Sequence, residues 1–78
     1  MKAKYKFIHF IESKDGELTA ENKIGYECRN NKTGKVLAYI FYYELWKGYC
    51  FTQADAQIIF NDKCLVDIID FLKQLKED

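Results

Sequence analysis

The sequence predicts an α+β fold, an antiparallel four-stranded sheet followed by one C-terminal helix that packs on one face of the sheet. Two observations predict this class. Side chains alternate with period two in four segments before residue 53, and the apolar spacing changes to three and four residues after Asn61. The connections are short, which favours antiparallel neighbours. Because no second helix is predicted, the helix must lie across the sheet.

The overall composition is that of one small globular domain, residues 1–78, with a modest core. Apolar residues make up 49% of the chain, which argues against disorder. The sequence shows no secretory-signal pattern and no run of about eighteen apolar residues, so we expect a cytoplasmic protein without a membrane span. The three cysteines are odd in number and widely spaced. We expect reduced thiols packed as small apolar groups rather than a disulfide.

The first two strands are predicted over residues 3–12 and 23–30, where polar and apolar side chains alternate. Residues 17–22 between them are polar and are interpreted as a connection. Residues 31–34 read Asn-Lys-Thr-Gly and predict a tight hairpin turn, because Asn and Gly tolerate a left-handed backbone.

The third strand, over residues 35–44, is apolar on both of its sides. Such a strand is usually central in its sheet and covered on both faces. Residues 45–48 interrupt the run, and residues 49–52 predict a short fourth strand. The helix follows from Asn61, whose side-chain oxygen can cap the free backbone N–H groups of the first turn.

One helix cannot shelter both faces of this sheet. A helix of about sixteen residues is roughly 24 Å long and 10 Å wide, which suffices for one face of four strands about 4.8 Å apart. We expect it to cover the side with Val36, Ala38 and Ile40, because the small Ala38 permits a close approach. The open side would then carry Leu37, Tyr39, Phe41 and Tyr43, extended by Tyr49, by Phe51 and by one of Phe7 and Phe10.

An exposed apolar surface larger than a few hundred Å² usually marks an interface, and tyrosine and tryptophan favour interfaces because the ring is buried while the polar tip stays in water. The sequence therefore predicts a small non-enzymatic protein-binding module. Its partner would be another protein, or a second copy of the chain in a structural homodimer. As an alternative, residues 17–22 or 53–59 fold over the open side. The predicted partner-binding residues are Tyr39, Phe41, Tyr43, Trp46 and Tyr49.

A single-stranded nucleic-acid-binding module is the alternative that uses the same aromatic residues, because exposed rings on a sheet can stack bases. Lysines along the first strand and around the hairpin fit this alternative. However, Arg29 is the only arginine, and arginine is the usual reader of bases and phosphates. Twelve basic residues also balance twelve acidic ones, which argues against a polyanion as partner.

No catalytic site, metal site or cofactor is predicted. His9 is the only histidine, and no motif places a nucleophile or further metal ligands beside it, so we expect a strand histidine with one or two hydrogen bonds. Asp67 and Asp70 lie three residues apart on the helix and are therefore neighbours. We interpret them as part of a solvated face, with an acidic surface for a basic partner as the functional alternative.

The C-terminal part of the chain, WKGYCF followed by IIFNDKCLVDIIDFLKQL, resembles a pattern found in short uncharacterised bacterial and phage proteins. That pattern has a tryptophan, an aromatic-x-aromatic strand and a helix of the form CLxDIxxFLxxL. It covers residues 46–78, although its loop before the helix often carries proline and this chain has none. The resemblance implies a small phage-like protein that inhibits a host defence or regulatory protein by binding it. The matching residues are Trp46, Tyr49, Phe51, Cys64, Leu65, Asp67, Ile68, Phe71, Leu72 and Leu75.

Overall fold

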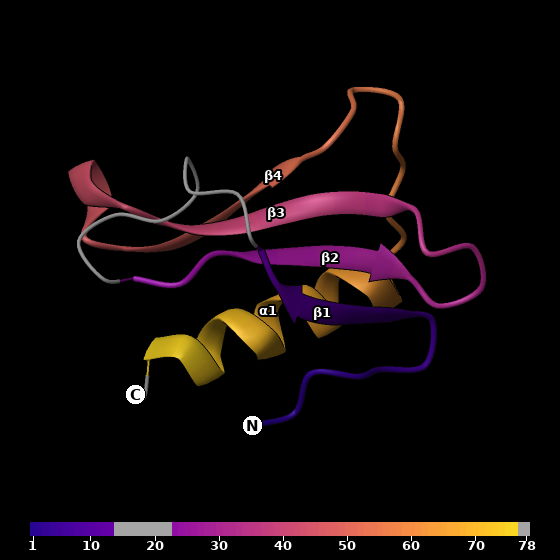
Figure 1. Cartoon of the computed structure of the whole chain (residues 1–78), viewed down its shortest axis with the longest axis horizontal. Coiled ribbons are helices and arrows are strands. Elements are labelled where there is room, and N and C mark those ends of the chain that lie inside the picture. The colour runs from indigo at the N-terminus through magenta and orange to yellow at the C-terminus, as the bar shows by residue number, and fades with distance from the viewer. Residues whose placement is uncertain (14–22, 77–78) are drawn as a thin grey trace.

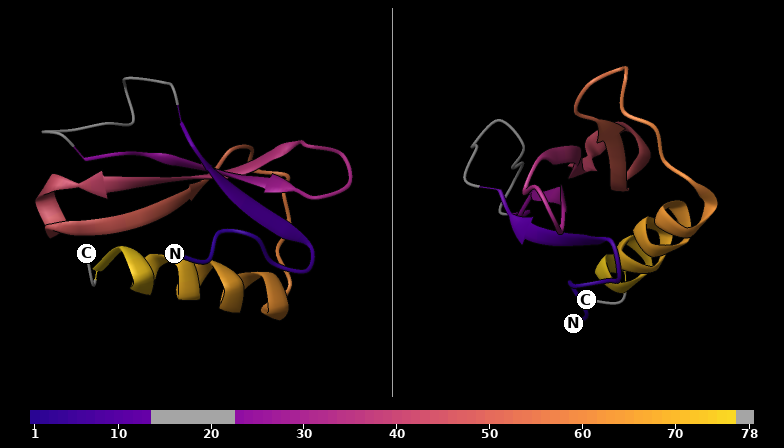
Figure 2. Two further views of the ribbon diagram at one scale, coloured as in Figure 1. Left: turned by 60° about the horizontal axis from the view of Figure 1, so that its bottom comes forward. Right: turned by 90° about the vertical axis from the view of Figure 1, so that its right-hand side faces the viewer.

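The computed structural model describes residues 1–13 and 23–76, which form an antiparallel sheet and one helix (Figure 1). The strands lie side by side in sequence order, and each pairs with the next in antiparallel fashion. The helix α1 (Asp62–Lys76) crosses one face of the sheet (Figure 2). The predicted α+β fold is therefore confirmed. The strands are β1 (Ile8–Glu12), β2 (Tyr26–Asn30), β3 (Val36–Tyr43) and β4 (Gly48–Gln53).

The core lies between α1 and the sheet. Phe71 at its centre is fully buried; its ring stacks on Phe10 with 4.1 Å between centroids and meets Tyr26 edge-on at 5.1 Å. Ala38 and Ile40 are also fully buried on this side, which confirms the prediction for these two residues. The prediction that Val36 shares this face is wrong, because a bulge in β3 pairs Val36 with Arg29, away from the core. The remaining members of the core are Tyr5, Ile8, Cys28, Ile68 and Leu75.

The first strand begins later than predicted, at Ile8 rather than at residue 3. The chain bends at residues 6–7 and folds its N-terminal arm back along β1, where Phe10 N donates to Ala3 O at 2.8 Å. Asn31 holds this bend, because its side-chain Nδ2 donates to the backbone oxygens of Tyr5 and Lys6. The bend depends on a residue far along the chain, which explains why the local alternation did not indicate it.

The hairpin between β2 and β3 forms as predicted over residues 31–34. Gly34 has a φ of +74°, and its N–H donates to Asn30 O at 2.9 Å. The Asn30 side chain accepts the N–H groups of Lys32 and Thr33. A bulge follows, since Arg29 pairs with Val36 while Cys28 pairs with Ala38. Leu37, predicted on the open side, lies in this bulge and packs partly against the core.

The start of α1 is also as predicted, because Asn61 Oδ1 accepts the N–H of Cys64 at 2.9 Å. This bond satisfies one of the donors that a helix leaves unpaired in its first turn. Asp62 follows in the first turn, and Lys73 and Lys76 occupy the last turn, so both ends carry charges that suit the helix dipole. The part of the chain that the structure describes contains no helix long and apolar enough to cross a membrane.

Candidate functional site

The candidate site is the face of the sheet that α1 does not cover. Alternation along β3 directs Ile40 into the core and its neighbours Tyr39 and Phe41 to the opposite face. Tyr39, Phe41 and Tyr43 are half-buried, and Trp46 just beyond the strand is 74% exposed. These positions agree with the prediction. We call Tyr39, Phe41, Tyr43 and Trp46 the aromatic row.

Edge-to-face contacts order three of the four rings of the aromatic row. Phe41 and Tyr43 meet at 6.1 Å between centroids with an interplanar angle of 83°, and Tyr43 and Trp46 meet at 5.2 Å and 89°. Aromatic pairs prefer this geometry because the positive edge of one ring meets the negative face of the other. Trp46 reaches Tyr43 because the short 3₁₀ helix Glu44–Trp46 closes with Lys47 in the left-handed conformation.

The neighbours of the aromatic row are polar without a net charge. On β2, the Arg29 guanidinium donates to Glu27 Oε1 from Nη2 at 2.6 Å and from Nε at 2.9 Å, and its Nη1 reaches Gly34 O at 3.3 Å. On β4, Cys50 and Thr52 lie opposite Phe41 and Tyr39. Because Arg29 already has these acceptors, the surface beside the row offers a partner little uncompensated charge.

The prediction that Tyr49 and Phe51 belong to this face is wrong. The register pairs Tyr49 with Tyr42 and Phe51 with Ile40, which places both residues on the helix side. The Tyr49 ring meets Tyr42 at 5.6 Å, and its hydroxyl donates to Ile24 O at 3.0 Å. The face on which each side chain of β4 lies depends on the length and geometry of the connection before the strand, which the sequence pattern does not show.

Neither Phe7 nor Phe10 extends the open face. Phe10 is buried against Phe71, and Phe7 lies in the bend, where it lines a hollow of about 300 Å³ with residues of α1 that include Val66. Ile11 takes their place, because it pairs with Glu27 on the open side and is 41% exposed. Sequence reasoning missed Ile11 as well as Cys50, since both depend on strand register.

Of the two helix carboxylates, Asp70 is exposed, in agreement with a solvated face, and the acidic surface for a basic partner stays a prediction. Asp70 accepts the Tyr5 hydroxyl at 2.7 Å, and Gln74 Nε2 donates to the same Tyr5 oxygen at 3.1 Å. Burial, and then the hydrogen bond to Asp70, raise the pKa of Tyr5 well above its usual range. Asp70 thus ties the N-terminal arm to α1. Asp67 is half-buried one turn earlier.

The remaining reactive side chains have simple surroundings. His9 Nδ1 lies 2.7 Å from Asn31 Oδ1, in agreement with the predicted strand histidine. All three cysteines are free thiols. Burial raises the pKa of Cys28 to about 12, with a smaller contribution from Cys64. Within residues 1–13 and 23–76, no three His, Cys, Asp or Glu residues are grouped to hold a metal ion.

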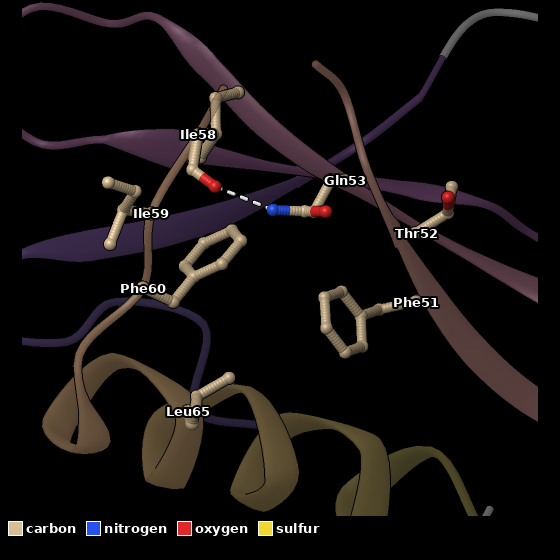
Figure 3. A pocket seen from close by; sticks show the side chains of 7 residues that line it. All are labelled: Phe51, Thr52, Gln53, Ile58, Ile59, Phe60 and Leu65. Atoms are coloured by element: carbon tan, nitrogen blue, oxygen red, sulfur yellow. Dashed lines mark hydrogen bonds between the residues drawn. The ribbon is translucent and has the colours of Figure 1, made fainter. Parts of the chain in front are cut away.

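Of the two segments considered as covers for the open face, residues 17–22 lie outside the described residues. Residues 53–59 lead from β4 towards α1 on the helix side. Gln53 Nε2 donates to Ile58 O at 2.5 Å, and Ile58 is buried (Figure 3). No protein-family model, curated protein or solved structure matches this chain, so its function is argued from this geometry.

Proposed function

We propose that this chain is a non-enzymatic protein-binding module whose contact surface is the aromatic row. The single observation that carries the proposal is that β3 presents apolar side chains to both faces of the sheet while α1 covers only one of them. Ile40 and Phe41 are adjacent in sequence, and both have large apolar side chains of the kind usually buried in a core. A partner that covers Phe41 would give the second face the shelter that α1 gives the first.

The chemistry of the row supports a protein surface as partner. Tyr39, Tyr43 and Trp46 each combine a large ring with one polar group, so a partner would bury the ring and bond the polar tip. The contacts of Tyr43 with Phe41 and Trp46 already order the rings of these three residues, which lowers the entropy that binding would cost. Because Trp46 is the most exposed ring, we expect its truncation to cost about 2 kcal/mol or more of binding free energy.

The resemblance to phage proteins extends this proposal. A small domain that covers a functional surface of a host defence or regulatory protein would inhibit it by steric blockage, without chemistry of its own. The partner would then offer an apolar patch with hydrogen-bond acceptors at its border, which matches rings that end in O–H and N–H groups.

Single-stranded nucleic acid is the second candidate for the row, and it has less support. Arg29, the only arginine of the chain, is paired with Glu27 and bonds to Gly34 O. Titration with fluorescent oligonucleotides at two salt concentrations separates the candidates. Binding that weakens steeply with salt would favour nucleic acid, since it would reflect release of counterions from phosphates. The proposal expects no binding even at low salt.

The direct test is capture of partner proteins from host extract on the immobilised chain, quantified by mass spectrometry. We expect Phe41→Lys and Tyr39→Lys to lose the partner, because each places a charge in the buried centre of the interface. Val66→Lys is the matched control, since Val66 is 62% exposed on α1, which lies on the opposite side of the sheet from the aromatic row. Circular dichroism should show that all three variants fold. The proposal is wrong if both row variants capture the same protein as the wild type.

A further inference from the structure

The two edges of the sheet differ in what lies beside them. The N-terminal arm lies along β1, where Phe10 N bonds to Ala3 O, and Lys4 forms a bridge with His9. At the other edge, β4 pairs with β3 alone among the strands that the structure describes, and its last three residues are exposed. The strand Gly48–Gln53 carries no charged side chain, although a charge on an edge strand is a common way to prevent pairing.

Near the end of β4, some backbone N–H and C=O groups point away from β3, where another strand could bond to them. Ala54 N donates to Leu37 O at 3.0 Å, in line with the register of the β3–β4 ladder. Because bonding direction alternates along an antiparallel strand, Thr52 directs its N–H and C=O toward β3, whereas Phe51 and Gln53 direct theirs outward. A strand of another chain would find both a donor and an acceptor at each of these two residues.

Apolar side chains flank this edge. Phe51 and Leu65 border an open groove of about 560 Å³ between β4, the connection that follows it and the first turn of α1 (Figure 3). Phe51 is 37% exposed, Leu65 38% and Ile59 90%. A strand added to β4 would cover part of this surface, which increases the apolar area buried at the new pair of strands.

We propose that two copies of the chain associate by antiparallel pairing of β4 with β4 of the second copy, around a two-fold axis at Phe51. Charge selects this register. Lys47 comes just before β4 and Asp55 two residues after its end. With Phe51 opposite its own counterpart, Lys47 of one copy and Asp55 of the other therefore flank each end of the paired strands with opposite charges, although Lys47 Nζ also lies 3.9 Å from Glu44 Oε2. Both side chains are exposed in the single chain. A shift by one pair of residues would lose these charge pairs.

This arrangement has a consequence for the open face. A two-fold axis perpendicular to a continuous sheet leaves both helices on one side and both aromatic rows on the other. The pair would therefore present two binding surfaces in one plane, and a partner with two copies of its own could be bound with avidity. The dimer uses the β4 edge, so its existence does not depend on the function proposed for the row.

The register predicts a specific disulfide. Thr52 lies opposite Cys50 of the second copy, in a pair without direct backbone hydrogen bonds, where Cα atoms are about 4.5 Å apart and a disulfide can form. Thr52→Cys should therefore become a covalent dimer on mild oxidation, with the introduced thiol bonded to Cys50. The matched control is Thr52→Cys combined with Cys50→Ser, which should not cross-link through this pair. A Thr52→Cys chain that stays monomeric after oxidation overturns the proposal.

A second test uses the position of Phe51, which in the proposed dimer lies opposite Phe51 of the second copy. Light scattering of the wild type should give twice the mass of one chain. Phe51→Lys alone and Phe51→Glu alone should each raise the dissociation constant by about tenfold or more, because like charges then face each other. An equal mixture of the two variants should restore the dimer. A monomeric wild type, or a mixture that behaves like its components, would show that β4 pairs with no second copy.

Discussion

The assignment of faces along β3 predicts that two adjacent residues differ sharply in their importance for stability. Ile40 is fully buried beneath α1, whereas Phe41 is half-buried on the opposite face. Truncating a buried isoleucine to alanine costs about 2–5 kcal/mol, because apolar contacts are lost and a cavity remains. Phe41→Ala should cost about 1 kcal/mol, mainly its cross-strand and edge-to-face contacts.

These magnitudes can be measured because the domain is small. At roughly 0.05–0.15 kcal/mol per residue, a chain of 78 residues has a free energy of unfolding of about 4–12 kcal/mol. With a urea dependence of about 1 kcal/mol per molar, Ile40→Ala should lower the midpoint of unfolding by about 2 M or more, and Phe41→Ala by about 1 M. An equal or larger loss for Phe41→Ala would refute the assignment of faces.

Three further predictions concern stability. Asn61→Ala removes the side-chain cap of Cys64 N–H and should lower the free energy of unfolding by about 1 kcal/mol in urea. Tyr5→Phe removes the hydrogen bond to Asp70 and should cost about 1 kcal/mol, whereas an unchanged midpoint would mean that this bond does not hold the arm. The third follows from Cys28, whose pKa of about 12 in the fold compares with an ordinary value of 9.0. Since the unfolded state releases this proton first, the free energy of unfolding should fall by up to about 1.4 kcal/mol per pH unit between pH 9 and 12. Cys28→Ala should show a smaller decline over that range, and a parallel decline would contradict this origin.

Features that depend on neighbouring residues could be predicted from the sequence. The cap at Asn61 needs only its own side chain and the N–H of Cys64 three residues later. The turn before Gly34 needs a residue that accepts positive φ, which glycine supplies. The opposite directions of Ile40 and Phe41 follow from strand geometry alone. For this reason Tyr39, Phe41 and Tyr43 were placed on the correct face.

Features set by distant contacts or by turn geometry could not be predicted in this way. Lys47 adopts a left-handed backbone with a φ of 52° before β4, and the register that follows places Tyr49 on the helix side. The bend before Ile8 depends on Asn31, which follows more than twenty residues later. Residues 3–12 keep a regular alternation across this bend, so their pattern indicates one continuous strand.

Among the predicted site residues, Trp46 shows how much of the candidate site was accessible to sequence reasoning. Its place after an aromatic strand indicated an exposed ring, but its edge-on contact with Tyr43 depends on the 3₁₀ helix between them. Cys50 was interpreted only as a small packed thiol, although it lies opposite Phe41 on the open face. The thiol of Cys50 can therefore report, through its alkylation rate, whether the surface beside the aromatic row is covered.

The most direct test of the central claim is the alkylation rate of Cys50 in the free chain and in the chain bound to a captured protein. Cys50 lies on the open face beside Phe41, and Cys64 on α1 serves as the internal reference. If the aromatic row is the binding surface, the partner should slow alkylation of Cys50 while Cys64 reacts at an unchanged rate. Equal rates at Cys50 with and without the partner would place binding elsewhere on the molecule.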